Sequence, residues 1–76
     1  MERLLTFGKR LKELREKAGL TQKEMAEQIG YTISHYQKIE YGKVNISVTL
    51  LADLAEQFHV SADYFLGRTE NREVNR

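Results

Sequence analysis

The sequence contains no cysteine, no proline and no tryptophan. Without cysteine the chain can form neither disulfides nor thiolate metal sites. Without proline no position breaks a helix outright, so other residues must end the helices. No apolar run approaches the roughly 20 residues that a membrane-spanning helix needs. The first six residues also turn polar too early for a signal peptide. We therefore expect a cytoplasmic protein without a membrane partner.

A large excess of charge of one sign is missing as well. The formal net charge is +1, from 12 basic and 11 acidic residues. Its distribution is uneven, because residues 1–20 carry six basic and three acidic side chains, whereas residues 47–66 carry three acidic and no basic ones. A basic front and an acidic rear weakly favour a polyanionic partner. The length of 76 residues and the 41% hydrophobic content predict one small globular domain.

One local pattern recurs four times. An apolar residue precedes Ser or Thr, and a second apolar residue follows four positions after the hydroxyl. The hydroxyl can accept a hydrogen bond from the first helical turn, and the apolar pair forms a hydrophobic staple. At Thr21 the capping box is complete, because Glu24 stands at the third helical position. The four repeats are Leu20-Thr21 with Met25, Tyr31-Thr32 with Tyr36, Ile46-Ser47 with Leu51, and Val60-Ser61 with Phe65.

Glycines mark the helix ends. Gly19, Gly30, Gly42 and Gly67 each follow an amphipathic stretch, where a residue with positive φ commonly ends a helix. Gly8 instead falls near the start of the first helix, where we expect a local weakness of up to ~1 kcal/mol.

These signals predict an all-α fold of five short helices. The expected helices span about 6–18, 22–29, 33–41, 48–58 and 62–66, and the end of the fourth has no glycine. We expect a domain over residues 1–67 and a polar, flexible tail over residues 68–76. The residues expected to face the core in the first and fourth helices are Phe7, Leu11, Leu14, Ala18, Leu50, Leu51, Leu54, Ala55 and Phe58.

The second and third predicted helices are separated by only three residues, Gly30, Tyr31 and Thr32. So short a link turns the chain sharply and crosses the helices steeply, as in a helix-turn-helix. Ala26 is small where the two helices would approach each other. Taken alone, this pattern also fits helix pairs in structural bundles.

Four stretches resemble a known family: LREKAGLTQ (14–22), MAEQIG (25–30), KIEYGK (38–43) and VSADYFLG (60–67). Together they are similar to the helix-turn-helix domain of the Cro and repressor proteins of lambdoid phages and of the Xre group of bacterial regulators. The resemblance implies a five-helix, lambda-repressor-like domain. It also implies sequence-specific binding of double-stranded DNA as a homodimer on a palindromic operator, with transcriptional regulation, chiefly repression, as the outcome.

The resemblance places Ile33, Ser34, Gln37 and Lys38 where the family reads base edges. Their chemistry partly agrees, since Lys38 can donate to guanine, Gln37 can pair with adenine and Ser34 can contact several bases. Ile33 stands where the family usually has a polar residue. It either contacts a thymine methyl group or reads no base.

Other residues are expected to hold phosphates. Gln22 opens the second helix, where the family uses a glutamine to bind the DNA backbone, and the N-termini of the helices offer free N–H groups. Ile46 stands where the family often has proline, which implies a looser loop. The full set of expected phosphate contacts is Gln22, Lys23, Thr32, His35, Lys43, Asn45 and Ser47.

The resemblance also implies two structural contacts. Arg15 is expected to form a salt bridge with Glu40, although two solvated charges would contribute only ~0–1 kcal/mol. The dimer contact is expected around Asp63, Tyr64, Phe65 and Leu66.

Enzymes and cofactor sites have no candidate in this sequence. His35 and His59 do not share a metal-ligand spacing, and neighbours such as Ser34 and His35 point in different directions on a helix. We therefore expect no catalytic site, no metal and no cofactor. The alternative to a DNA-binding regulator is a protein-interaction module or an antitoxin-type protein that binds a protein partner. A protein effector also remains open.

Overall fold

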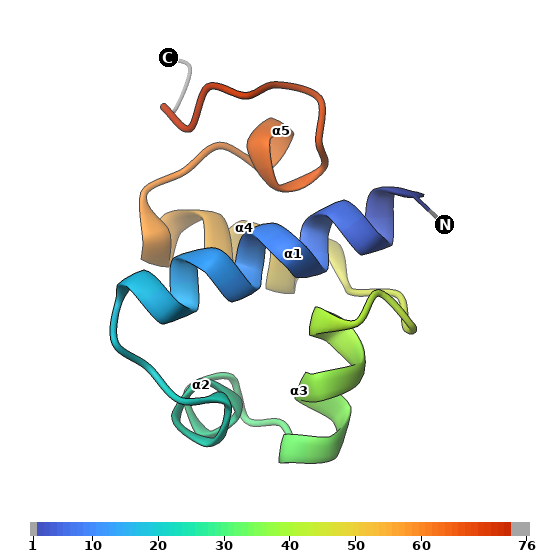
Figure 1. Ribbon diagram of the computed structural model, residues 1–76, viewed down its shortest axis with the longest axis vertical. Helices are drawn as coiled ribbons and strands as arrows, with labels where there is room; N and C mark the ends of the chain where they lie inside the picture. The colour runs from blue at the N-terminus through green and yellow to red at the C-terminus, as the bar shows by residue number, and fades with distance from the viewer. Residues whose placement is uncertain (1, 74–76) are drawn as a thin grey trace.

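The structure, a computed structural model, describes residues 2–73 and contains five α-helices in that part of the chain. They are α1 (Glu2–Lys17), α2 (Gln22–Ile29), α3 (Ile33–Glu40), α4 (Val48–Phe58) and α5 (Ala62–Phe65). Figure 1 shows α1 crossing the middle of the molecule, with α2 and α3 on one side of it and α5 on the other. No strand occurs in residues 2–73. The predicted all-α fold of five helices is confirmed.

The helix starts lie at the predicted hydroxyl residues. Thr21, Thr32, Ser47 and Ser61 have extended backbones, and each side chain accepts the N–H of the third residue that follows. At α2 the capping box is complete, because Glu24 Oε1 in turn accepts the Thr21 N–H at 2.9 Å. These hydrogen bonds to Thr21 hold the pKa of the Glu24 carboxyl below its usual value.

The end of α4 lies at a residue that the sequence did not mark. His59 adopts the left-handed conformation, with φ of 56°, and its backbone N–H caps the helix. This conformation normally favours glycine, because a side chain there costs about 1–2 kcal/mol. Gly30 performs the same function at the end of α2 with φ of 75°.

α1 differs from its prediction in two ways. It begins at Glu2 rather than near residue 6, and it ends at Lys17, so Ala18 lies beyond it and is exposed. Gly8 therefore lies inside the helix and is buried. A Cβ atom at Gly8 would stand 2.2 Å from the Glu40 carbonyl oxygen, so this glycine permits α1 to touch the end of α3. The interpretation of Gly8 as a mere weakness was wrong.

The core joins all five helices. Phe7 of α1 contacts Phe65 of α5, with ring centroids 5.0 Å apart. In the fourth helix, Leu51 and Phe58 were expected to be buried but are only partly covered, at the margin of the core. The buried apolar residues are Phe7, Leu11, Leu14, Met25, Ala26, Tyr36, Ile39, Leu50, Leu54, Ala55, Val60, Tyr64 and Phe65.

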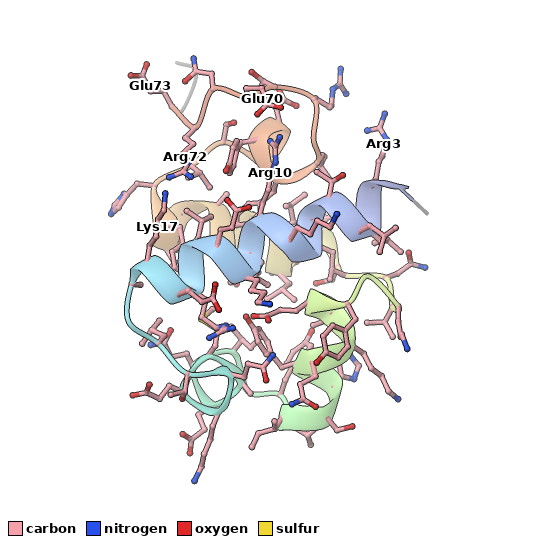
Figure 2. All side chains as sticks on the ribbon, viewed as in Figure 1. Arg3, Arg10, Lys17, Glu70, Arg72 and Glu73 are labelled. Atoms are coloured by element: carbon pink, nitrogen blue, oxygen red, sulfur yellow. The ribbon has the colours of Figure 1, made fainter. Side chains whose placement is uncertain are left out.

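Residues 68–73 follow α5 without forming a helix and return over it (Figure 1). The Arg10 guanidinium of α1 donates to the Thr69 carbonyl at 2.7 Å and to Glu70 Oε1 at 3.1 Å, and the Ser61 N–H donates to the Arg72 carbonyl at 3.0 Å. Figure 2 shows Arg10 pointing from α1 toward α5 and this segment. The domain boundary at residue 67 and the flexibility of the tail stay predictions, and residues 74–76 lie outside the described part.

Candidate nucleic-acid interface

The two faces of α3 have opposite character. Tyr36, Ile39 and Glu40 are buried against the rest of the domain. On the opposite face Ile33, Ser34 and Lys38 are exposed, and Gln37 is half-buried. The four residues expected to read bases thus share the outer strip of α3, as their helical spacing requires. A helix presenting such a strip can enter the major groove.

α2 and α3 form the compact turn that a helix-turn-helix needs. Ala26 is completely buried, and its carbonyl accepts the Tyr31 N–H at 2.9 Å. Because Gly30 has the left-handed conformation, the chain turns at once, and only three residues separate α2 from α3. On the outside of the turn the Tyr31 ring meets the His35 ring edge to face, with centroids 4.9 Å apart.

A buried ion pair joins α1 to the last residue of α3. Arg15 Nε of α1 is 2.6 Å from Glu40 Oε2, and the Glu40 side chain is only 1% exposed. The Tyr36 hydroxyl donates to the same carboxylate oxygen, and Arg15 Nη1 donates to the Leu20 carbonyl at 2.7 Å. The structure therefore brings Arg15 and Glu40 together as the resemblance implied.

The contacts of this ion pair change the pKa values of Arg15 and Tyr36. The hydrogen bond from Arg15 to Glu40 raises the pKa of the guanidinium above its usual value. Burial, and secondarily the hydrogen bond to Glu40, raises the pKa of Tyr36 well above that of an ordinary tyrosine. At neutral pH, Arg15 is thus a fixed cation and Tyr36 a neutral hydrogen-bond donor.

Two glutamines continue this network to the surface. Gln22 Nε2 donates to Glu40 Oε1 at 3.1 Å, and Gln37 Nε2 donates to Gln22 Oε1 at 3.0 Å. The sequence reasoning missed both contacts. No spacing could have shown them, since they depend on how α2 crosses α3.

The phosphate candidates come from α2, from α3 with its N-cap, and from the segment between α3 and α4. Thr32 and Ser47 use their hydroxyl oxygens as caps of α3 and α4, at 3.1 and 3.0 Å from the backbone nitrogens of His35 and Leu50. These hydroxyls still have a hydrogen to donate. Gln22 is half-buried, and the exposed candidates are Lys23, Thr32, His35, Lys43, Asn45 and Ser47.

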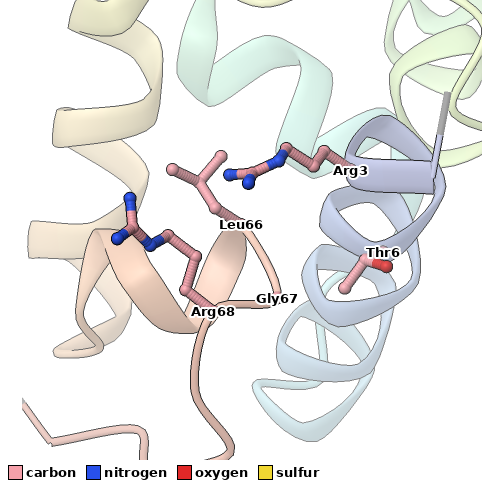
Figure 3. A pocket seen from close by; sticks show the side chains of 5 residues that line it. All are labelled: Arg3, Thr6, Leu66, Gly67 and Arg68. Atoms are coloured by element: carbon pink, nitrogen blue, oxygen red, sulfur yellow. The ribbon is translucent and has the colours of Figure 1, made fainter.

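The dimer candidates divide into two groups. Tyr64 and Phe65 are core residues, 5% and 0% exposed, so they offer no surface in this conformation. Asp63 is exposed and Leu66 is half-exposed. Leu66 lines a surface pocket of about 280 Å³ between the start of α1 and the end of α5, shown in Figure 3 with Arg3, Thr6, Gly67 and Arg68.

Most basic side chains of α1 do not contribute to the surface beside α3. Arg15 is buried in its ion pair. Figure 2 shows Arg3, Arg10 and Lys17 pointing from α1 toward the side of α5, away from α2 and α3. The basic front of the sequence therefore does not become one positive surface beside α3.

Residues 2–73 contain neither a membrane-spanning helix nor a metal-binding cluster of side chains. None of the helices in this range is long and apolar enough to cross a membrane. No group of three His, Cys, Asp or Glu side chains is arranged to hold a metal ion there.

The family and its relatives agree with this geometry. A helix-turn-helix family model matches residues 11–65. The chain is 38% identical over 71 residues to the HTH-type transcriptional regulator ImmR of Bacillus subtilis (strain 168), covering 93% of this chain and 56% of ImmR. It is also 38% identical over 63 residues to YonR, an uncharacterized SPbeta prophage-derived HTH-type transcriptional regulator of the same strain, covering 83% of this chain and 58% of YonR.

A solved structure has the same fold. The restriction-modification controller protein C.AhdI from Aeromonas hydrophila superposes with a TM-score of 0.72 at 31% identity, over 86% of this chain and 98% of that one. ImmR, YonR and C.AhdI are regulators by name and not enzymes. The chain spans slightly more than half the length of the two Bacillus proteins.

The fold and the outer face of α3 thus define a helix-turn-helix DNA-binding domain. The chain belongs to the helix-turn-helix family of the Xre type, whose members bind DNA and regulate transcription.

Proposed function

We propose that this protein is a repressor that binds a palindromic operator as a homodimer and reads it by inserting α3 into the major groove. The observation that carries the proposal is the outer strip of α3. It presents an apolar side chain, a hydroxyl, an amide and an amine from Ile33, Ser34, Gln37 and Lys38. These groups can contact, respectively, a thymine methyl, several bases, adenine and guanine.

Phosphate contacts would hold α3 in register. The N-termini of α2, α3 and α4 each carry backbone N–H groups beyond the one that their cap accepts. Such groups bind anions well. Lys23 and Lys43 are exposed and would add positive charge, and Gln22, Thr32, His35, Asn45 and Ser47 would add neutral or polar contacts.

The test separates reading from positioning. We would select bound duplexes from a random pool with the wild type, then measure affinities for each base at every position. Lys38→Ala should relax the preference at one or two positions per half-site, by ~1–3 kcal/mol. Lys17→Ala removes a lysine of α1 that points toward the side of α5, away from α3 (Figure 2), and it should leave the base preference unchanged. If the wild type binds no duplex even at low salt, the proposed function is wrong.

We propose a dimer because a single recognition helix contacts too few base pairs to specify an operator. One recognition helix reads only a few base pairs, and two copies with half-sites about 34 Å apart double that number. We place the contact at Asp63 and Leu66, because these members of the predicted set reach the surface and Leu66 borders the pocket of Figure 3. A side chain from a second copy can enter this pocket of about 280 Å³, which Arg3 and Arg68 line together with Leu66.

The dimer proposal is tested by sedimentation and by footprinting. Leu66→Asp should weaken self-association and the cooperative occupation of a palindrome. Ala52→Asp is the matched control, since Ala52 is an exposed apolar residue in the middle of α4, away from the proposed phosphate contact at Ser47. A selected site that proves to be a single asymmetric half-site, saturated by one monomer, contradicts the model of two-fold binding.

Repression needs its own measurement. A reporter whose promoter overlaps the selected operator should lose expression when the protein is present, and regain it with Lys38→Ala. Increased expression would identify an activator. Binding to chromosomal DNA would place the chain in the cytoplasm of a bacterial cell.

A further inference from the structure

A continuous line of hydrogen bonds leads from the buried ion pair to the outer strip of α3. Glu40 Oε1 accepts from Gln22 Nε2 at 3.1 Å, and Gln22 Oε1 accepts from Gln37 Nε2 at 3.0 Å. Three elements contribute, because Arg15 of α1 holds Glu40 of α3, and Gln22 opens α2. The line ends at a residue that the proposed function assigns to base recognition.

The chemistry of Glu40 determines the direction of every bond in this line. A carboxylate only accepts hydrogen bonds, so the Gln22 amide must turn its NH₂ group toward Glu40. Its carbonyl oxygen then faces Gln37, and this oxygen requires a donor. Gln37 must therefore turn its own NH₂ group toward Gln22. The Glu40 carboxylate thus fixes the orientation of both side-chain amides. Without it, each amide could be turned by 180° with its oxygen and NH₂ group exchanged.

This leaves Gln37 with a defined pair of groups for DNA, the carbonyl oxygen and the second N–H of its NH₂ group. Adenine presents a donor at N6 and an acceptor at N7 in the major groove, which matches that pair. Guanine presents two acceptors, O6 and N7, so its O6 would face the fixed carbonyl oxygen of Gln37. An unrestrained glutamine could turn its NH₂ group toward guanine instead.

We propose that Gln22 is a positioning residue that transmits the polarity of Glu40 to Gln37 and thereby selects adenine over guanine at one operator position. The inference rests on the proposed function, since it concerns how the same face of α3 discriminates bases. It gives Gln22 a task in addition to the phosphate contact proposed above, for which its second side-chain N–H stays available. A phosphate contact changes affinity for all sequences alike, whereas a positioning residue changes the preference at one base.

The experiment compares base preference rather than affinity alone. Selection with the wild type and with Gln37→Ala first identifies the operator position that Gln37 reads. Duplexes with adenine or guanine there are then titrated with each variant. The wild type should prefer adenine about tenfold, and Gln22→Ala should reduce that preference to about twofold. Replacing the adenine by 7-deazaadenine should weaken the wild type more than it weakens Gln22→Ala, because the Gln37 amide is no longer held in one orientation in the variant.

Two variants of the same helix serve as controls. Gln28→Ala also removes a glutamine of α2 that has one hydrogen bond to another glutamine, from Gln57 Nε2 at 2.8 Å. It should change neither affinity nor preference. Lys23→Ala removes a proposed phosphate contact and should weaken both duplexes equally. If Gln22→Ala behaves like Lys23→Ala and the preference for adenine persists, the inference is overturned.

A measurement without DNA keeps the inference separate from the proposed function. In a nuclear magnetic resonance spectrum of the free protein, one side-chain amide hydrogen of Gln37 should show the shift and slow solvent exchange of a hydrogen-bonded proton. Gln22→Met, of similar length but without donor or acceptor, should abolish both signs. If they persist, Gln22 does not orient Gln37. If they vanish yet the wild type binds no duplex, the hydrogen bonds are real and the proposed function, together with the adenine preference, is wrong.

Discussion

Glu40 receives hydrogen bonds from three side chains while its own side chain is almost completely buried. Arg15 Nε, the Tyr36 hydroxyl and Gln22 Nε2 all donate to its carboxylate. A buried charge of this kind is costly to desolvate, and its neighbours must compensate for the lost water. Among the described residues, every buried side-chain nitrogen and oxygen has a hydrogen-bond partner.

Removing Arg15 should therefore destabilise the domain strongly. Arg15→Ala leaves the Glu40 carboxylate buried without its cation, and we expect a loss of about 3–5 kcal/mol. In a domain of this size each kcal/mol lowers the melting temperature by roughly 4–8 °C, so calorimetry detects the change easily. Lys17→Ala, at an exposed basic residue of the same helix, should change the melting temperature little. Additive effects of Arg15→Ala and Glu40→Ala in a double-mutant cycle would show that the pair does not interact.

Tyr36 should make the stability fall at alkaline pH. Its pKa is raised in the folded protein, so above the ordinary tyrosine pKa of about 10 the unfolded chain loses a proton that the folded chain retains. The stability contributed by the neutral hydroxyl is complete below about pH 10 and is lost as the pH rises further. The slope is at most about 1.4 kcal/mol per pH unit. Urea unfolding between pH 8 and 11 measures it, and Tyr36→Phe should remove this component. An identical pH profile in Tyr36→Phe would exclude Tyr36 as its source.

At the scale of the elements, the contact between α1 and α3 decides how the recognition helix is held. Gly8 lies where the two helices touch, with the Ile39 and Glu40 carbonyls on the place that a side chain would occupy. Arg15 contacts Glu40 two turns further along the same helix. α3 is thus fixed to α1 through its last turn, while its first three residues, Ile33, Ser34 and His35, stay exposed.

Gly8→Ala tests this contact, because we expect the substitution to lower the free energy of unfolding although alanine favours helices. Helix propensity alone predicts that alanine stabilises an interior helix position by up to ~1 kcal/mol. The structure predicts the opposite, because the new Cβ atom would overlap the Glu40 carbonyl and push α1 from α3. We expect a loss of at least about 1–3 kcal/mol in chemical denaturation. Lys9→Ala, at the exposed neighbouring position, controls for propensity. A stabilised Gly8→Ala protein would show that the close approach does not exist.

At the scale of the whole molecule, the small net charge and its placement limit the electrostatic part of DNA binding. Several basic residues are engaged elsewhere, since Arg15 is buried and Arg10 binds α5 and the following segment. Lys23, Lys38 and Lys43 are the exposed lysines on α2, on α3 and in the loop that follows α3. We therefore expect two or three phosphate contacts per monomer.

Salt dependence measures this number directly. For a dimer with two or three contacts per subunit, the slope of log K against log salt should be roughly −4 to −5. Lys43→Ala should reduce the steepness by about 2 in the dimer, one contact from each subunit. Lys17→Ala should leave the slope unchanged, because Lys17 points to the side of α5 (Figure 2). A slope near zero would exclude phosphate contacts as a main source of affinity.

The helices and their order could be predicted because their signals are local. A Ser or Thr hydroxyl caps the helix that begins beside it, and a glycine ends a helix through its own φ, so neither needs the rest of the fold. The outer strip of α3 follows from helical periodicity once the buried Tyr36 and Ile39 are assigned. The assignment of α3 to DNA needed the family resemblance as well, since periodicity alone does not distinguish a DNA-facing strip from a solvated one.

Other features depend on which segments meet in space, and the sequence by itself does not determine them. Gly8 has a function only because the end of α3 lies against it, and His59 ends α4 in a conformation that its residue type does not favour. Tyr64 and Phe65 were expected at the dimer contact, but both are buried in the core, where Phe65 packs against Phe7 of α1. The contacts of Gln22 with Glu40 and Gln37 arise only where three helices cross. The reason is that local signals choose the backbone conformation of each segment, whereas burial and hydrogen-bond partners are set by residues distant in the chain.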